Sequence, residues 1–576
     1  MKELHPIFLD ENPANGEIYV RHQNNGISLD TYFNMFDLYK WRQYTIIENI
    51  YLKIQATGTC KLEIYTLNAT NTETLIYQET LSAPNEEERY IHIPQKIDTR
   101  FLFCRIKDSN QFSLKKLAWC TDTEPCHDVY LRCAICTFKK EAYIYRNLRL
   151  LNQIRENDLF IKKSLSIVIA DNGNSLEREK TAYDFVEIYS NINTGGAGGF
   201  ARAMIEICQS SKPCTHILIM DDDIEIAPTA IILSINLLAY LKEEYRNHFI
   251  GGAMMNLDQR NIKHASLEWF DKKHFWSSTG PVDVNNRLNV LKASIHSFHP
   301  DQYQAWWYCI IPAKVVNLNN LPLPLFFQND DVEYALRNQA KIILMNGIAV
   351  WHEPFYKKVQ NMKPYYSLRN ALIVSATESL YPTDRILQVI RNSFRREICQ
   401  FNYSGAQVYI DILEDFMQGP SILKSAEKCA EILKREISRN EKMIPFKELG
   451  LTKSSVHRVI RTDRLHGLKR RIYDLTFNGH LLPSCLRKKE VEIIHCVGEQ
   501  GPLCYMRKTV IAVDPLNQQG VIRKFDKAIG KRLIRSFEKA YSNCFSKKVS
   551  LLAEYRNAHT KMTSILFYKN YLKMGC

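Results

Sequence analysis

Three adjacent carboxylates, Asp221, Asp222 and Asp223, directly follow the apolar run 217–220. A core strand that ends in this way needs a cation nearby, because uncompensated charge at the edge of a core is costly. Side chains two residues apart on an extended segment face the same side, so Asp221 and Asp223 can share one divalent ion. Taken alone, the triplet could instead be an exposed acidic turn.

A glycine-rich turn precedes this triplet. It reads NINTGGAGGFARAM from Asn191 and leads into the expected helix AGGFARAMIEICQ. Glycines without side chains let a backbone or a substrate approach closely, although a glycine run alone is often a plain loop. Because the turn and the triplet bracket one helix, together they predict a site for a nucleotide diphosphate and a metal ion.

Two later segments add candidates. The tract 264–312 is rich in aromatic residues and histidines, and Trp306 and Trp307 precede an apolar strand. Flat rings beside polar groups are typical of a sugar-binding surface, and core packing is the alternative. After an expected strand ending at Phe327, Asp330 and Asp331 stand at a helix entrance. Capping explains one carboxylate, so the pair indicates a general base.

One more apolar strand, IILMNGIAVW, delivers His352 at its end. An imidazole in that place suits a third metal ligand.

The elements that position these residues are those of a parallel α/β sheet. Apolar runs within 129–141, 165–174 and 184–191, with a helical segment between the first two, lead to the glycine turn. Ligands of such sheets bind beyond the carboxyl ends of the strands. The candidates at these ends are Thr137, Phe138, Lys140, Asp171 and Asn193.

Two further domains are expected around this sheet, since 576 residues exceed one hydrophobic core. Short alternating runs after Thr45 predict an N-terminal β-sandwich or jelly roll. The C-terminal part reads as basic helices, with 490–497 and 506–515 expected to form a β-hairpin and 521–545 an amphipathic helix. The predicted domains are a β-sandwich at 1–125, an α/β domain at 126–376 and a mainly helical domain at 377–576.

Charge separates the last domain from the others. The chain has a net charge of +14, and residues 377–576 hold 36 Lys and Arg against 20 Asp and Glu. An acidic partner for this region is therefore expected: an anionic membrane surface first, nucleic acid only second. The last helix could equally be a solvated packing helix, and we expect no nucleic acid.

The composition is that of a globular, cytoplasmic protein. No apolar run approaches the length of a membrane span, and no hydrophobic signal core follows Met1. The 16 cysteines are scattered, mostly in apolar segments, as reduced buried thiols are. Cys133 and Cys136 form a CxxC without a second such pair, which disfavours a zinc site. We expect the protein in the cytoplasm, peripheral at most on the inner membrane face.

A family resemblance rests on the order TFKK, IADNG, NTGGAGGFARAM, MDDD, AWWYCIIP, NDDVEYALR and WHEPF. This order resembles inverting family-two glycosyltransferases of the GT-A (Rossmann-like) fold, and among them the polymerising galactofuranosyltransferases of mycobacterial galactan synthesis. The segments TYFNMF and WRQYT, within 31–45, are similar to the N-terminal β-domain of those enzymes.

The resemblance implies roles for the candidates. Asp221, Asp223 and His352 would bind Mn²⁺ or Mg²⁺, and the ion would hold the diphosphate of a UDP-sugar. Uridine and phosphate would contact Thr137, Phe138, Lys140, Asp171 and Asn193, to which the glycine turn and the triplet add Gly196 and Asp222. Asp331 would be the base. Glu268 and Trp307 would line the acceptor site, to which we add Trp306 and Asp330.

This chemistry is physically consistent. A cation stabilises the charge that develops on the leaving UDP, and a single displacement assisted by one carboxylate base inverts the anomeric centre. The implied reaction moves galactofuranose from UDP-galactofuranose onto a lipid-linked or polysaccharide glycan of the cell envelope. The sequence leaves open another nucleotide-sugar, a nucleotidyltransferase, a non-catalytic carbohydrate-binding protein, and whether the chain forms a homo-oligomer.

Two positions depart from the family pattern. Lys140 stands where the family has an arginine near the diphosphate, so the bidentate fork is lost. Ser367 stands in YYSLRN where the mycobacterial enzymes have a histidine. The second departure bears on the acceptor and on polymerisation.

Overall fold

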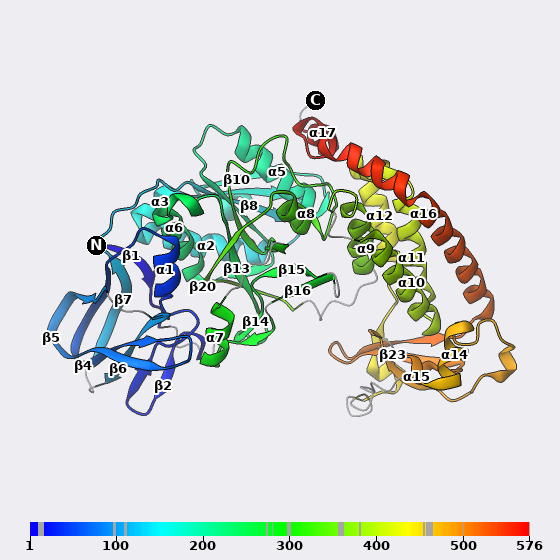
Figure 1. Cartoon of the computed structure of the whole chain (residues 1–576), viewed down its shortest axis with the longest axis horizontal. Helices are drawn as coiled ribbons and strands as arrows, with labels where there is room; N and C mark the ends of the chain where they lie inside the picture. The colour runs from blue at the N-terminus through cyan, green and yellow to red at the C-terminus, as the bar shows by residue number, and fades with distance from the viewer. Residues whose placement is uncertain are drawn as a thin grey trace. The chain divides into compact units, whose positions relative to one another are not determined.

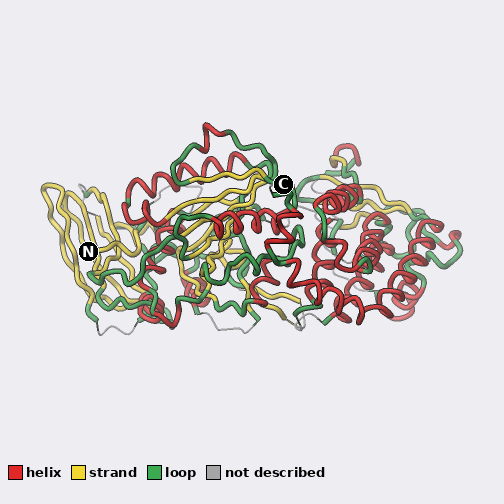
Figure 2. Tube along the Cα trace, turned by 90° about the horizontal axis from the view of Figure 1, so that it is seen from above, coloured by secondary structure: helices red, strands yellow, loops and turns green. Residues whose placement is uncertain are grey.

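The computed structural model describes residues 1–9, 17–95, 99–108, 112–271, 275–278, 280–295, 301–354, 362–378, 382–452, 456, 465–498 and 500–574. The chain divides into two compact units. Unit 1 comprises Met1–Pro322, Asp331–Pro354 and Thr563–Tyr568, and unit 2 comprises Leu323–Asp330, Phe355–Met562 and Lys569–Cys576. The mixed α/β class is confirmed, with most strands in unit 1 and long helices in unit 2 (Figures 1 and 2).

Unit 1 begins with a seven-stranded sheet. Its strands are β1 (Lys2–Pro6), β2 (Arg21–Gln23), β3 (Gly26–Ser28), β4 (Ile50–Leu67), β5 (Glu73–Ile93), β6 (Phe101–Asp108) and β7 (Ser113–Thr121). The order is β1-β7-β4-β6-β3-β2, and β5 pairs with the other side of β4. Along its free side, β4 pairs first with β7 and then with β6. The register of β4 with β5 shifts between Ala56 and Gly58, where the glycine adopts a φ of 88° that other residues avoid.

The second sheet of unit 1 contains the predicted parallel strands. β8 (Leu131–Thr137), β9 (Leu165–Asp171), β10 (Val186–Ser190) and β11 (His216–Met220) lie in the order β10-β9-β8-β11 and pair in parallel. The order continues through β19 (Tyr308–Pro312), β13 (Phe249–Asn256), β14 (Ile262–Ala265) and β17 (Val282–Asp283). β20 (Ile342–His352) pairs with β13 and with the short β12 (Ile224–Ile226). The carboxyl ends of the parallel strands therefore meet at one edge.

Helices connect and cover this sheet. They are α2 (Glu141–Asn157), α3 (Leu159–Ser164), α4 (Arg178–Thr181), α5 (Gly195–Gln209), α6 (Pro228–Tyr240), α7 (Arg287–Ser294) and α8 (Asp330–Arg337), while α1 (Leu38–Tyr44) belongs to the N-terminal part. A small sheet beside them has the order β16-β15-β18, formed by Phe275–Ser278, Glu268–Asp271 and Gln302–Tyr303.

The glycines of the glycine-rich turn permit close packing at the start of α5. A Cβ added at Gly199 would lie 2.1 Å from Cys136 Sγ of β8, and one at Gly198 would lie 2.1 Å from Thr194 Oγ1. Both distances are far below any real contact. Gly199 therefore lets α5 lie this close to β8, whereas Gly198 leaves room for the side chain of Thr194 directly before the same helix. The close approach at Gly199 is an approach of helix to strand.

Unit 2 is mainly helical, as predicted. Its longer helices are α9 (Met362–Val374), α10 (Thr383–Cys399), α11 (Tyr403–Phe416), α12 (Ala426–Ser438), α14 (Gly467–Leu475) and α16 (Lys527–Met562). Phe537 of α16 is fully buried and stacks on Phe394 of α10, with 3.9 Å between ring centroids. In the described part of the chain, no helix combines the length and apolar character needed to span a bilayer.

Three local predictions are wrong. Residues 321–329 form no strand, and α8 begins already at Asp330. Residues 519–524 form β24 (Gln519–Lys524), so the last amphipathic helix begins only at Lys527. The predicted hairpin is also incorrect, because β22 (Glu492–His495) pairs in parallel with β23 (Thr509–Asp514), and β23 forms its hairpin with β24.

Candidate functional site

The carboxyl edge of the parallel strands brings the acidic triplet to His352. β12 begins directly after the triplet and pairs antiparallel with the end of β20, with Ile224 opposite His352. This register puts Asp223 beside the imidazole: His352 Nε2 lies 3.0 Å from Asp223 Oδ1. Lys140, at the start of α2, approaches the other oxygen, with 3.1 Å from Nζ to Oδ2.

The ring of His352 is held in a defined state. Its Nδ1 lies 2.6 Å from the backbone oxygen of Glu353, which can only accept, so Nδ1 carries a proton. Nε2 faces Asp223, and their 3.0 Å contact is a hydrogen bond only when Nε2 also carries a proton; a metal ion would take the lone pair of Nε2 in place of that proton. This is the arrangement of a metal-binding histidine whose second nitrogen is fixed by a backbone carbonyl.

The neighbouring carboxylates differ in pKa. Burial alone would raise the pKa of Asp223, but the hydrogen bond and charge of His352, with those of Lys140, lower it below its usual value. Burial raises the pKa of Asp222 to about 6, and the charge of Asp223 adds to the rise. Asp222 accepts the backbone N–H of Phe138 at 2.9 Å, which ties the triplet to the end of β8.

The donor chemistry fits a divalent ion in part. Carboxylate oxygens and an imidazole nitrogen are ligands that Mn²⁺ and Mg²⁺ accept. The structure brings Asp223 and His352 together, and Asp221 precedes them in the same turn. Among the described residues, however, no three His, Cys, Asp or Glu side chains are grouped as a metal site, and the ammonium of Lys140 stands at Asp223.

The predicted donor contacts lie at the same strand ends. Thr137 pairs with Asp171 in the β8–β9 register, and the Asp171 carboxylate accepts three backbone N–H groups, from Gly173, Ser175 and Leu176, at 2.9–3.0 Å. Asp171 therefore shapes the loop after β9. Asn193 Oδ1 accepts the Gly195 N–H at 3.1 Å at the start of α5.

The remaining donor candidates stay accessible. Phe138 is exposed, Gly196 is half-buried in the first turn of α5, and Lys140 is half-buried. An exposed ring, a helix N-terminus and an ammonium are groups that could contact a base and a diphosphate.

Asn172 is a residue that the sequence reasoning missed. Its Nδ2 donates to Gly195 O at 3.0 Å, and its Oδ1 accepts from Asn191 Nδ2 at 2.7 Å. It thereby fixes the start of α5 against the end of β9. The signal for Asn172 is its place directly after a buried strand, the same position from which Asp171 alone was predicted.

A second carboxylate pair involves Asp331. Asp331 is half-buried in the first turn of α8, and its Oδ1 accepts the Val332 N–H at 2.8 Å. Burial raises the pKa of Asp331, and burial together with the charge of Asp331 raises the pKa of Glu268. Glu268 lies on β15 opposite Tyr303, whose hydroxyl also bonds to it. Two interacting carboxyls of raised pKa suit proton transfer near neutral pH.

The two tryptophans are buried. Trp306 packs edge-on against Phe200 of α5 and Tyr334 of α8, with centroids 5.3 and 5.9 Å apart. Trp307 donates its indole N–H to Gly252 O at 2.7 Å. The rings thus point to different neighbours, as expected, but both are about 95% buried. Trp306 links the glycine-rich helix to the helix of Asp331. Within the aromatic tract, 272–274, 279 and 296–300 lie outside the described residues.

The triplet and the tryptophans share one sheet edge. Met220 pairs with Tyr308 in antiparallel register. Asp221 therefore leaves β11 where Trp307 enters β19. Asp330 is buried at the start of α8 and follows Asn329, whose side chain donates to Ser367 O at 3.1 Å.

Comparison with known proteins finds similarity to galactofuranosyltransferases. The family described as galactofuranosyltransferase 2 N-terminal matches residues 15–122. Two proteins named galactofuranosyltransferase GlfT2 also match, both at 25% identity. The chain from Mycolicibacterium smegmatis matches over 432 residues, 69% of this chain and 66% of its own length. The chain from Mycobacterium tuberculosis matches over 436 residues, 69% of this chain and 67% of its own length.

This chain is similar to GlfT2. The matched region spans about two thirds of the length of each GlfT2. Among solved structures, the CBM22-1 and GH10 modules of Clostridium thermocellum xylanase 10B with xylohexaose match 34% of this chain and 42% of theirs, at 12% identity. The TM-score of 0.15 is too low to support a common fold.

The three hydrogen bonds of Asp171 predict a structural role. Asp171→Asn puts an NH₂ group against backbone N–H donors, so the free energy of unfolding should fall by about 1–3 kcal/mol. Denaturation should show the loss, and hydrogen exchange should quicken at residues 173–176. Asp184→Asn, at a well-exposed carboxylate paired with Arg155, is the control and should change stability by less than about 1 kcal/mol. Equal effects of both substitutions would contradict the structural role.

Proposed function

We propose that the protein is an inverting, metal-dependent glycosyltransferase that moves galactofuranose from UDP-galactofuranose onto a cell-envelope or surface polysaccharide. The observation that carries the proposal is the Asp223–His352 contact, made where β12 joins β20 at the carboxyl edge of a parallel sheet. The similarity to GlfT2 over 69% of the chain supports it. A GT-A fold with an N-terminal β-sandwich is part of the proposal.

Different residues of the chain bind the nucleotide diphosphate and the metal ion. Phe138, Lys140 and the first turn of α5 bind the nucleotide diphosphate, and the Asp171 and Asn172 contacts keep that turn in place. Asp221, Asp223 and His352 would hold Mn²⁺ or Mg²⁺. When bound, the ion stabilises negative charge on the leaving diphosphate. Lys140 meanwhile can turn from Asp223 to a phosphate, since its side chain is long and half-exposed.

Asp331 takes the proton of the acceptor hydroxyl. A half-buried carboxylate of raised pKa is a stronger base than an exposed one and is still mostly ionised near neutral pH. The charge of Asp331 in turn raises the pKa of Glu268. Trp306 and Trp307 support the acceptor side, and Asp330 contributes at the helix start.

Two alternative functions have less support. The same edge of the sheet would serve another nucleotide-sugar equally well, because the Asp223–His352 contact does not recognise the sugar. A non-catalytic carbohydrate-binding protein would have no use for a base of raised pKa. Measuring UDP release from a series of UDP-sugars distinguishes these cases.

The metal proposal predicts two losses. EDTA should abolish UDP release by the wild type, and Asp223→Ala should abolish it in Mn²⁺ while circular dichroism stays unchanged, because a strand-end ligand and no core side chain is removed. Glu225→Gln is the matched control: this carboxylate lies two residues on and pairs with Arg260 at 2.7 Å. It should retain activity. Normal turnover of Asp221→Ala and Asp223→Ala in EDTA would refute the metal role.

The base proposal separates two adjacent carboxylates. Asp331→Asn keeps the shape but cannot take a proton, so kcat should fall by about 10²-fold or more while UDP affinity holds. Asp330→Asn is the control and should act through the acceptor KM or stability. If Asp330→Asn lost turnover instead, the two roles would be exchanged.

The pH profile checks the same assignment. Because the base form is lost as pH falls through the raised pKa, kcat/KM should drop on the acid side near pH 6. The charge of Asp331 raises the pKa of Glu268, so Asp331→Asn should lower the pKa of the Glu268 carboxyl, as an NMR titration would show. An unchanged pKa of Glu268 would show that the two carboxyls do not interact.

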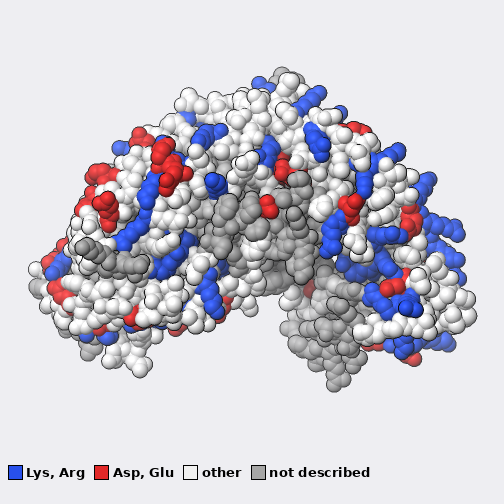
Figure 3. All heavy atoms as spheres, in the orientation of Figure 1, with Lys and Arg blue, Asp and Glu red and all other residues white. Residues whose placement is uncertain are grey.

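We also propose that the basic C-terminal region docks on an anionic inner membrane surface, where lipid-linked acceptors would be reached. Figure 3 shows Lys and Arg gathered over the C-terminal helices. On α16, the exposed basic residues include Arg532, Arg535 and Lys539. Leu533 and Phe537, beside these basic residues on α16, are buried in packing, so docking at this part of the helix would rest on charge.

Vesicle binding should therefore require anionic lipid and weaken with salt. At about 1 kcal/mol for each basic residue at the surface, changing Arg532, Arg535 and Lys539 to Gln should weaken binding by about 10²-fold. Changing Lys115 and Lys116 of β7 to Gln is the control and should have little effect. Equal binding to neutral and anionic vesicles, or none to either, would leave α16 a packing helix only.

A further inference from the structure

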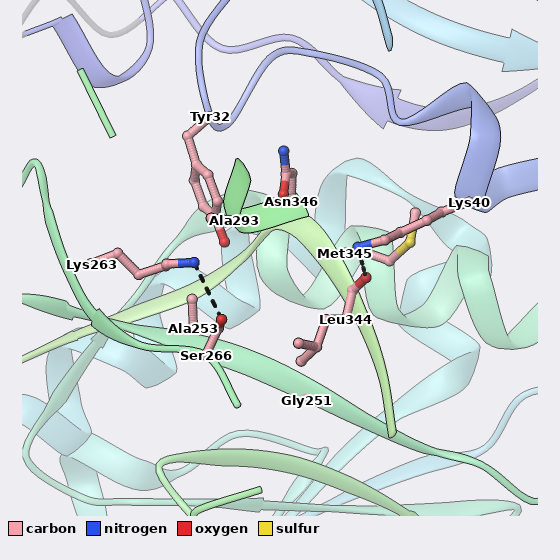
Figure 4. A pocket seen from close by; sticks show the side chains of 10 residues that line it. All are labelled: Tyr32, Lys40, Gly251, Ala253, Lys263, Ser266, Ala293, Leu344, Met345 and Asn346. Atoms are coloured by element: carbon pink, nitrogen blue, oxygen red, sulfur yellow. Dashed lines mark hydrogen bonds between the residues drawn. The ribbon is translucent and has the colours of Figure 1, made fainter. Parts of the chain in front are cut away.

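A small cavity lies in unit 1 between the N-terminal segment and the second sheet. Tyr32 and Lys40 line it from the N-terminal side, and Lys263, Ser266 and Asn346 from the sheet (Figure 4). It forms where β20 departs from β13: Gly251 pairs with Leu344 but Ala253 pairs with Ala349, so residues 345–348 bulge out opposite one residue. The cavity has room for about one water-sized sphere, about 10 Å³.

Lys263 brings an unbalanced charge to this cavity. Its side chain is 98% buried, and its Nζ donates to Ser266 Oγ at 3.3 Å. Across the described ranges, no ion pair joins Lys263 to a carboxylate. Burial, together with the charge of Lys40, lowers the pKa of Lys263 to about 8, so the ammonium form still predominates at neutral pH. A buried charge without a counterion is costly.

Lys40 does not provide compensation. Its Nζ donates to Leu344 O at 2.7 Å and lies 3.8 Å from Asp37 Oδ2. That same Asp37 oxygen lies 3.1 Å from Arg100. One carboxylate is therefore shared by two cations, and Lys263 adds a third positive charge. The interior around the cavity carries more positive than negative charge.

The cavity also offers a neutral donor without a partner. Asn346 is 93% buried, and its amide nitrogen makes no hydrogen bond to any residue that the structure describes. An unsatisfied buried N–H group costs about 1–3 kcal/mol. The ammonium of Lys263, the unpaired amide nitrogen of Asn346 and the hydroxyl of Tyr32 line one water-sized space, and each can donate a hydrogen bond. Three such donors, one of them a buried positive charge, favour an anion.

We propose that this cavity binds one monatomic anion of the size of chloride, held by Lys263 with donors from Asn346 and Tyr32. The small space favours a single atom over phosphate or a carboxylate, which are several times larger. The anion neutralises the surplus charge where the N-terminal segment meets β13 and β20. The inference is independent of the catalytic proposal, because none of these residues belongs to the carboxyl edge.

Thermal unfolding of the full chain tests the site. At equal ionic strength, sodium chloride should raise Tm above its value in sodium gluconate by about 2 °C, since gluconate cannot enter. Lys263→Met removes the charge, so the chloride effect should vanish and Tm in gluconate should be no lower than that of the wild type. Equal Tm values of the wild type in both salts would overturn the proposal, as would a chloride effect that survives in Lys263→Met.

Lys242→Met is the matched control. Lys242 is a half-buried amine in the connection between α6 and β13, and it donates to Arg42 O and Gln43 O of the N-terminal part at 2.8 and 3.0 Å. It does not line the cavity, so its variant should keep the full chloride effect. If Lys242→Met also lost the chloride effect, that effect would reflect general stability, and the proposed anion site would be wrong.

Crystals of the wild type grown in bromide decide the matter if Lys263→Met does not fold. An anomalous peak within hydrogen-bond distance of Lys263 Nζ, in the cavity, is the expected result. A water molecule without anomalous signal would overturn the anion site and leave a solvated lysine.

Discussion

The candidate site depends on one strand pairing. β12 is three residues long, yet its antiparallel register with β20 sets Ile224 opposite His352 and so brings the imidazole to Asp223. Side chains alternate along a strand, so a shift by one residue would turn the imidazole to the other face. The register thereby provides the hydrogen bond and charge of His352 that lower the pKa of Asp223.

Around that pairing, backbone groups do most of the positioning. Glu353 O fixes the tautomer of His352, the Phe138 N–H holds Asp222, and three loop amides hold Asp171. Glu353 O and the Phe138 N–H lie directly after β20 and β8, so the strands position them. The side chains free to meet a ligand are consequently long or exposed ones, such as Lys140 and Phe138.

The sequence predicted those parts of the fold that local patterns determine. Apolar strands with polar ends, the glycine turn and the helix of Asp331 were all found from neighbouring residues. Partners distant in the chain were not: nothing local distinguishes the parallel β22–β23 pair from a hairpin, and residues 519–524 extend because β23 pairs with them. Burial of Trp306 was equally hidden, since Phe200 and Tyr334 come from two distant helices.

The bulge in β20 divides that strand into two stretches with different tolerance to change in length. Residues 345–348 are looped out, so a deletion or insertion there could be absorbed before the pairing with β13 resumes at Ala349. Between Ala349 and His352, each residue is paired, and one added residue would reverse the side on which the imidazole projects. Relatives of this protein should therefore vary in length before Ala349 and keep a constant spacing after it.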